Sequence, residues 1–401
     1  MINYKKSIII LVIIFFLILF LFLKNSVNYH IQCDVLTEKI CADVHEPVNL
    51  NEIFNKKENN SHSPQIAIDS KGNPYVVYYQ GFAYYDGKKW IEKNITDLWV
   101  PDIAIASDDS IHVVYNLWGR ITNYINSFDK GESWGNHVVL HPNYGYWANI
   151  FIDKNDTIHV VWGRDSLDNN LDTVFYSRSS DFGKTWFNSS ILMGSNEPKV
   201  AVDNLGYIHV VVGNQVCADQ GINGDFWCGV SYSRSTDGGL TWSTPWNFDS
   251  DALPGNKSGH PHVAADSKGN VYIVWSQNNN LFYRISKDNG KTWSKEKKIP
   301  FKGYAFFTEI VVDENDNLHA VWADGGGVDA NEFNGRGIFY SIYDGNKWTN
   351  PIVISNPNVS AYRPGIAINK NKIGIVWAGG GGHPINDENV FFNSIDILQI
   401  K

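Results

Sequence analysis

Short stretches of alternating apolar and polar residues recur along most of the chain. Each stretch turns at a segment rich in Asp, Asn, Gly and Lys and then continues into a second alternating stretch, which often ends in an aromatic residue. Period-two alternation interrupted by such a turn predicts a β-hairpin. Seven hairpins of this kind are predicted, at residues 66–78, 103–115, 150–162, 200–212, 263–275, 310–322 and 366–377.

A second kind of hairpin follows most of the first ones. Its turn reads SFDKGESW (127–134), SSDFGKTW (179–186), STDGGLTW (235–242) and SKDNGKTW (286–293), with shorter forms at 84–90 and 343–348. The Asp carboxylate can accept amides of its own turn, Gly supplies left-handed backbone, and the Trp packs between sheets. Two hairpins make a four-stranded antiparallel sheet, so the repeats predict an all-β, seven-bladed β-propeller.

These turns resemble the Asp-box, or BNR repeat, of the sialidase superfamily, S/T-x-D-x-G-x-T-W. The resemblance extends from about residue 62 to the end of the chain. It implies a propeller whose boxes lie on the face opposite the binding site. It does not imply an activity, because Asp-boxes also occur in propellers that are not enzymes. Sialidases are typically six-bladed, and the seven repeats of this chain depart from that pattern.

The last repeat lacks a box and a fourth strand. It offers the hairpin 366–377 and one strand near 390–395, while residues 47–54 resemble the outermost strands of other repeats. An open ring would leave strand edges unpaired, so we expect 47–54 to pair beside 390–395. The expected organisation is a membrane anchor at 1–24, a linker with the closing strand at 25–61, and the propeller at 62–401.

The amino-terminal segment predicts a transmembrane helix. Residues 8–23 are all apolar and are flanked by Lys5, Lys6 and Lys24. As a helix they span about 24 Å, close to the thickness of a hydrocarbon core when the lysines snorkel. A cleaved signal peptide is the alternative, but no small-residue cleavage site follows. The lysines before the segment predict a single-pass protein of the cell membrane, with the propeller outside the cytoplasm.

Composition and cysteine usage fit an exported all-β protein. The chain has 15 Trp, 20 Tyr, 21 Phe and 34 Gly, and its net charge of −9 without a basic stripe argues against a nucleic-acid partner. Cys33 with Cys41, and Cys217 with Cys228, each close a short loop without metal-ligand spacing. Two disulfides are expected, with four buried thiols as the alternative.

The loops between the second and third strands of the blades vary most, so a site is expected on their face. The resemblance implies that a sialidase needs three arginines around a substrate carboxylate and a Tyr nucleophile assisted by a carboxylate. Arginines that precede boxes (Arg178, Arg234 and Arg284) are interpreted as structural. The catalytic candidates are Arg120, Arg164, Arg336, Arg363, Glu197, Glu309 and Tyr362, with Asp102, Asp165, Tyr146 and Tyr304 as further acids and tyrosines.

Aromatic and imidazole side chains on this face are the candidate binding residues: Trp147, Trp227, His260 and His262. Trp227 lies in the loop bracketed by Cys217 and Cys228, and the two histidines precede an inner strand. Four other histidines share one register of the repeat and are interpreted as packing residues: His112, His159, His209 and His319. No cofactor is expected; the acidic loop with Asp324, Asp329 and Glu332 is a weak Ca²⁺ candidate that lacks EF-hand spacing.

Three functions remain open from the sequence. A carbohydrate- or protein-binding surface module is preferred, because it needs only loops, aromatic side chains and a polar funnel. An exo-acting, sialidase-like glycoside hydrolase and a structural envelope component are the alternatives. The expected partner is a glycan or a cell-surface protein. Whether the protein is an enzyme depends on whether three of the non-box arginines meet beside a Tyr–carboxylate pair.

Overall fold

The computed structural model describes residues 40–54, 59–60, 63–93, 95, 98–117, 121–142, 145–164, 173–194, 196–213, 229–248, 258–325, 337–356, 359–380 and 387–399. The predicted anchor lies outside these ranges, and so do Cys33, Arg120, Asp165, Cys217, Trp227, Cys228, Asp329, Glu332 and Arg336. No helix within these ranges has the length and apolar character needed to cross a membrane.

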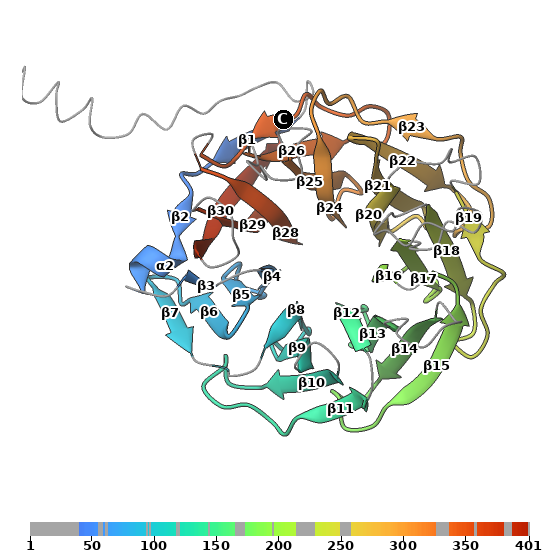
Figure 1. The fold of residues 1–401 in the computed structure, drawn as a ribbon, viewed down its shortest axis with the longest axis horizontal. Coiled ribbons are helices and arrows are strands. Elements are labelled where there is room, and N and C mark those ends of the chain that lie inside the picture. The colour runs from blue at the N-terminus through green and yellow to red at the C-terminus, as the bar shows by residue number, and fades with distance from the viewer. Residues whose placement is uncertain are drawn as a thin grey trace, which may run out of the picture.

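Seven sheets surround a central axis, and the innermost strands are β4, β8, β12, β16, β20, β24 and β28 (Figure 1). The predicted seven-bladed propeller of four-stranded blades is confirmed. The first three blades are β4 (Gln65–Ile68), β5 (Pro74–Tyr78), β6 (Gly81–Tyr85) and β7 (Trp90–Lys93); β8 (Trp99–Ile105), β9 (Ile111–Leu117), β10 (Ile121–Ser127) and β11 (Val138–His141); and β12 (Gly145–Ile152), β13 (Ile158–Arg164), β14 (Thr173–Ser179) and β15 (Phe187–Leu192).

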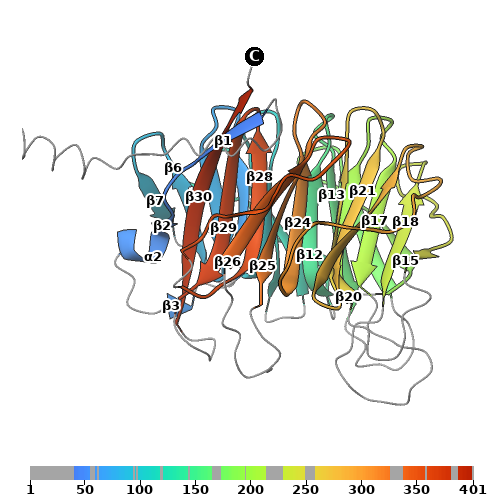
Figure 2. The same ribbon diagram turned by 90° about the horizontal axis from the view of Figure 1, so that it is seen from above.

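The next three blades repeat this meander, and all strands run roughly along the axis (Figure 2). They are β16 (Asn196–Val202), β17 (Ile208–Gly213), β18 (Val230–Ser235) and β19 (Trp246–Asn247); β20 (Ser258–Ala265), β21 (Val271–Gln277), β22 (Asn280–Ser286) and β23 (Lys297–Lys298); and β24 (Ala305–Val312), β25 (Leu318–Asp324), β26 (Gly337–Tyr343) and β27 (Ile352–Val353). Blade 7 has β28 (Ala361–Asn369), β29 (Lys372–Gly379) and β30 (Asp387–Gln399) as its inner strands.

The two ends of the described chain together close the ring, as the blue and red strands of Figure 1 show. β30 pairs with β1 (Ile40–Val44) and β2 (Val48–Asn49) in antiparallel fashion, and with β3 (Asn59–Asn60) in parallel. The predicted pairing of 47–54 is therefore confirmed at 48–49, but the closing strand begins earlier, at Ile40. Residues 50–53 were expected to extend it and instead form the short helix α2 (Leu50–Ile53).

A side-chain cap explains why the chain leaves the sheet after Asn49. The Asn49 side chain accepts hydrogen bonds from the backbone amides of Asn51 and Glu52, which is N-cap geometry. Its amide group also donates to the Glu52 carboxylate at 3.0 Å. Helix formation then buries Leu50 against Val376 and Val390 of blade 7. Leu50 is therefore buried, as expected for a closing strand, but it belongs to a helix.

The Asp-boxes join neighbouring blades. Asp181 accepts hydrogen bonds from the hydroxyls of Ser179 (2.7 Å) and Thr185 (2.6 Å) and from the Thr185 amide (2.9 Å). The box Trp then packs edge-on against an aromatic ring of the preceding blade, as Trp186 does on Tyr124 at 4.9 Å between ring centroids and Trp134 does on Phe82. The predicted packing of the box tryptophans between sheets is confirmed.

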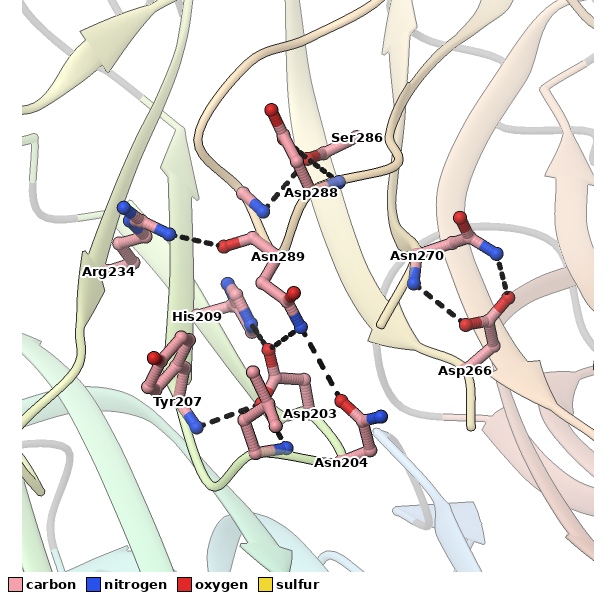
Figure 3. Close-up of polar contacts among 12 residues, drawn as sticks. Asp203, Asn204, Tyr207, His209, Arg234, Asp266, Asn270, Ser286, Asp288 and Asn289 are labelled. Atoms are coloured by element: carbon pink, nitrogen blue, oxygen red, sulfur yellow. Dashed lines mark hydrogen bonds and ion pairs between the residues drawn. The ribbon is translucent and has the colours of Figure 1, made fainter. Parts of the chain in front are cut away.

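The turns of the first hairpins meet the boxes on the same face (Figure 3). Asp203 accepts the amides of Leu205 and Tyr207 and bonds His209 at 3.3 Å, and His209 bonds the Tyr232 hydroxyl at 2.8 Å. From the next blade's box, the Asn289 side chain donates to Asp203 at 2.6 Å.

The residues interpreted as structural take part in these contacts between and within blades. His112, His159 and His319 repeat the bond from the His209 position to a buried tyrosine hydroxyl. Burial lowers the pKa of His112 to about 4. The arginines that precede boxes bond backbone carbonyls, as Arg234 does to Asn289 at 2.6 Å. Both interpretations from the sequence are confirmed.

Candidate functional site

Each inner strand is entered through a residue with left-handed backbone. We call these residues the outer ring: Ser63 (φ 53°), Val100 (44°), Trp147 (50°), Glu197 (47°), His260 (51°), Phe307 (48°) and Arg363 (50°). In six blades this residue coincides with a β-bulge between the first and second strands. Left-handed backbone is unfavourable for any residue with a Cβ, and most of all for a β-branched one. Strain of this kind persists only where the surrounding structure imposes it, and it clusters at functional sites.

The outer ring surrounds a cavity of about 80 Å³ on the axis. The inner strands begin here, so the cavity opens on the face of the variable loops, opposite the boxes. Two residues further along each strand is a second set, which we call the inner ring: Gln65, Asp102, Asn149, Lys199, His262, Glu309 and Gly365. Most inner-ring residues line both the cavity and a channel of about 380 Å³ that continues along the axis. The inner ring therefore forms the floor of the cavity.

Glu197 and His260 form a close pair on one side of the cavity. The Glu197 Oε2 and His260 Nδ1 atoms are 2.6 Å apart, and both side chains are largely buried. Burial opposes ionisation of Glu197, but His260, Arg363 and Lys199 together hold the pKa of its carboxyl below the ordinary value. An ionised carboxylate only accepts hydrogen bonds, so Nδ1 of His260 carries the hydrogen and donates a hydrogen bond to Glu197.

Arg363 reaches the axis from the opposite side. Its guanidinium carbon lies 5.2 Å from the centre of the Trp147 ring and 5.4 Å from that of Phe307. One guanidinium nitrogen donates to the Ser63 hydroxyl at 2.5 Å. Within the described part of the chain, Arg363 forms no ion pair with a carboxylate. Two aromatic rings therefore lie within cation–π distance of a guanidinium that has no carboxylate partner among the described residues.

The inner ring is a connected polar network. Lys199 donates to Glu309 at 2.8 Å, and Gln65 donates to the same oxygen at 3.0 Å. Gln65 reaches Glu309 past blade 7 because that blade has glycine there; a Cβ at Gly365 would lie 2.8 Å from the Gln65 Oε1 atom. Burial disfavours the charge of Glu309, yet Lys199 and His262 hold the pKa of its carboxyl below normal.

Asp102 and His262 complete the floor of the cavity. Asp102 accepts hydrogen bonds from Asn149 (2.6 Å) and from the Ile150 amide (2.9 Å) of the next blade, and burial raises its pKa to about 6. Burial, together with the charge of Lys199, lowers the pKa of His262 to about 4, so this imidazole is neutral at neutral pH. Among the described residues its Nδ1 atom has no hydrogen-bond partner.

The structure brings several of the predicted residues together. Trp147, Glu197, His260, Glu309 and Arg363 line the cavity, and His262 faces the channel below it. Tyr362 precedes Arg363 in β28 but does not line the cavity, and Tyr146 has the same position beside Trp147. Of the four non-box arginines, the described residues bring Arg363 to the cavity; Arg164 ends β13, and its side chain is not described.

The predicted disulfides and the calcium site are not settled by these residues. Cys41 lies in β1 opposite Leu398, and its side chain is not described. Asp324 accepts the Tyr304 amide at 2.9 Å. No group of three His, Cys, Asp or Glu side chains that could hold a metal ion is present within the described ranges.

Sequence reasoning missed Ser63, Val100 and Phe307 of the outer ring and Gln65, Asn149, Lys199 and Gly365 of the inner ring. The signal was a three-residue repeat at the start of every inner strand: SPQ, VPD, WAN, EPK, HPH, FTE and RPG. Five of these triplets have proline in the middle, and the residues on either side of it belong to the two rings. Aligning this triplet across the seven repeats would have identified both rings.

Comparison with known proteins gives a fold but no close relative. Neither a protein-family model nor a curated protein sequence matches the chain. Among solved structures, a protein of unknown function from Dyadobacter fermentans DSM 18053 matches with a TM-score of 0.55 and 15% identity, over 89% of this chain and 99% of that one. The α-L-arabinofuranosidase Arb93A from Fusarium graminearum gives 0.53 and 16%, over 86% and 98%. The polysaccharide lyase Uly1 gives 0.55 and 11%, over 84% and 90%.

These likenesses concern the fold. The β-propeller that the resemblance of the boxes to the sialidase superfamily implied is confirmed as a fold. Because this chain is 11–16% identical to these structures, the likeness does not extend to the chemistry of the cavity, which depends on the residues of this chain.

Proposed function

We propose that this sialidase-like propeller binds an acidic saccharide in the axial cavity, with Arg363 holding the anionic group. The observation that carries this proposal is a guanidinium that lies close to the ring centres of both Trp147 (5.2 Å) and Phe307 (5.4 Å) and has no carboxylate partner among the described residues. A planar guanidinium suits bidentate bonding to a carboxylate or sulfate. Aromatic faces beside it suit the apolar face of a sugar ring.

The fold and the position of the cavity on the propeller axis favour a saccharide over a protein as the ligand. Arb93A, captured with an iminosugar inhibitor, and the polysaccharide lyase Uly1 both act on carbohydrates with propellers of this shape. The cavity lies on the axis, where a chain end or a short stretch of polysaccharide enters more readily than a folded surface. We further propose that residues 1–24 anchor the propeller to the cell membrane with this face outside the cytoplasm.

A sialidase-like hydrolase is the second candidate and is less well supported. Hydrolysis needs a protonated acid beside the leaving oxygen. Glu197 and Glu309 both have pKa values held below the ordinary range, so both are ionised at neutral pH. Asp102 has a raised pKa, but its carboxylate accepts hydrogen bonds from Ile103, Asn149 and Ile150. No described carboxyl group in the cavity is therefore both protonated and available.

The test is a glycan array probed with the full-length protein, comparing uronate-containing, sulfated and neutral saccharides. Arg363→Gln should weaken binding of the acidic ligands at least about tenfold, because a charge-assisted bidentate bond is lost. Lys268→Gln is the matched control, since it removes one positive charge from a side chain that is 70% exposed on the box face. Equal binding by wild-type and Arg363→Gln protein, or a preference for neutral saccharides, would contradict the proposal.

A further inference from the structure

We infer that the cavity also catalyses β-elimination at a uronate residue of its ligand, with His260 as the base. This inference rests on the proposed function, since it requires an acidic saccharide in the cavity. The observation behind it is that the Glu197–His260 pair and the Arg363 guanidinium both lie beside the Phe307 ring. Together these groups supply the two things that removal of a proton beside a carboxylate requires.

The first requirement is an oriented base. The 2.6 Å bond to Glu197 keeps the proton of His260 on Nδ1, which makes Nε2 the basic nitrogen. When Nε2 takes a proton, the ionised Glu197 stabilises the resulting imidazolium, as in other carboxylate–histidine pairs. The imidazole also packs against Phe307 with 4.1 Å between ring centroids, so its plane is fixed from a second side.

The second requirement is a cation for the substrate carboxylate. A proton on the carbon next to a carboxylate is weakly acidic, because its removal places further negative charge on an already anionic group. A guanidinium bonded to that carboxylate neutralises it and stabilises the charge that develops. Arg363 lies 5.4 Å from the centre of the Phe307 ring that His260 contacts, and it helps to lower the pKa of Glu197. Arg363 and His260 therefore both lie beside Phe307 in the cavity, where one substrate residue can contact both.

The reaction balances without a cofactor. The bond from C5 of the uronate to its hydrogen breaks, and the proton goes to Nε2 of His260. The electron pair forms the C4–C5 double bond, and the C4–O glycosidic bond breaks with its electrons on oxygen. The leaving oxygen takes a proton from water, and His260 returns its proton to the solvent. Nothing is oxidised or reduced, and the products are a new chain end and an unsaturated uronate.

This chemistry also accounts for the charge state of the carboxyl groups. β-Elimination needs no protonated carboxyl group, whereas acid-assisted hydrolysis does. The cavity holds Glu197 and Glu309 ionised beside His260 and Lys199. Two ionised carboxylates do not supply the acid that a hydrolase needs. A lyase can use both of them, because Glu197 stabilises the base His260 and Glu309 holds Lys199 in the floor of the cavity.

The experiment incubates the full-length protein with polygalacturonate, alginate, hyaluronate and a neutral glucan. The conjugated double bond is followed by ultraviolet absorbance, and retention on each immobilised polysaccharide is measured in parallel. We expect absorbance to rise with at least one uronate polymer and not with the glucan. His260→Gln should lower this rate at least about a hundredfold while leaving retention unchanged, because it removes the base and keeps the shape.

Glu197→Gln separates a role in catalysis from a role in folding. Loss of the carboxylate should lower kcat while leaving KM unchanged, because the imidazolium that forms during the reaction loses its stabilising partner. His45→Gln is the matched control; His45 pairs with Asp396 at the outer strand of blade 7, and its replacement should leave kcat and KM unchanged.

Each outcome decides one of the two proposals. Retention without unsaturated product overturns the elimination and leaves saccharide binding in place. Release of new reducing ends without a double bond also overturns it, in favour of hydrolysis. Absence of retention and of product overturns the proposed function itself. Full activity of His260→Gln protein would show that another group is the base and would overturn the assignment made here.

Discussion

At the scale of single residues, the site is defined by backbone geometry before side-chain chemistry. Seven non-glycine residues with φ between 44° and 53° surround the axis, and they differ widely in size and charge. The conformation is therefore a property of the position rather than of the residue. Left-handed backbone costs roughly 1–2 kcal/mol for an L-residue. The ring keeps that cost while its side chains vary, as expected where the direction of the side chain matters for function.

Replacing one strained residue by glycine should reveal this cost. Val100→Gly removes a β-branched side chain from left-handed backbone, while the added flexibility of the unfolded chain offsets part of the gain. We expect a net stabilisation of about 0.5–1 kcal/mol in urea unfolding. Val139→Gly is the control, because Val139 is exposed in β11 with ordinary backbone and should lose about 1 kcal/mol. Equal destabilisation by both changes would show that the ring is unstrained.

At the scale of elements, the two ends of the blades have different tasks. The hairpin turns and the boxes carry Asp side chains that hold their own loops and touch the next blade, as at Asp203 and Asn289. The opposite end carries the two rings and the cavity. The turn hydrogen bonds are thus concentrated on one face, and the residues with left-handed backbone and the buried charged side chains lie on the other.

The boxes should make stability depend on acid. Hydrogen bonds from Thr185 and Ser179 lower the pKa of Asp181 to about 2, and those from Thr241 and Ser235 do the same for Asp237. A folded pKa below the unfolded one gives stability that is present above the unfolded value and is lost as pH falls through the folded value. The urea midpoint should therefore fall between about pH 4 and pH 2.

A double variant checks that the boxes are the source of this dependence. Asp181→Asn with Asp237→Asn should have a lower urea midpoint than wild type at neutral pH, because uncharged amides accept the turn hydrogen bonds less strongly. Its midpoint should change less over the acidic range, since two of the titrating groups are gone. An unchanged slope would assign the acid sensitivity to other carboxylates.

At the scale of the whole molecule, the ring is closed by strands from both ends of the described chain. β1 and β2 lie on β30, and Leu50 from α2 packs against Val376 and Val390 of blade 7. The inner ring makes a second closure on the axis, where Gln65 of blade 1 passes Gly365 to bond Glu309 of blade 6. The geometry of the cavity therefore depends on contacts between residues far apart in sequence.

A single substitution at the closure should weaken the whole ring. Leu50 is 1% exposed, and Leu50→Ala should cost about 2–4 kcal/mol in urea unfolding through the cavity it leaves. Ile53→Ala lies in the same helix with 45% of the residue exposed and should cost less than about 1 kcal/mol. Similar losses for both would mean that α2 does not seal blade 7.

The sequence alone determined the fold of this protein and the roles of its repeated residues. Period-two alternation, the Asp-Gly turns and the box tryptophans are local signals, and a β-hairpin is stabilised largely by its own turn and cross-strand pairs. Seven copies of such a unit leave a ring as the arrangement that covers the strand edges. The closing strand could be placed for the same reason, but its end at Asn49 could not, because the Asn49 side chain caps helix α2 in place of further strand pairing.

Only the tertiary structure decided which residues of the two rings contact one another. The outer ring takes one residue from each of seven blades, and neither spacing nor hydrophobicity indicates that Trp147 and Phe307 enclose Arg363. The pairing of Glu197 with His260, and of Lys199 with Glu309, likewise joins residues 63 and 110 positions apart. Ion pairs and aromatic contacts form between residues that are close in space. These residues come close to one another only when all seven blades of the propeller are assembled.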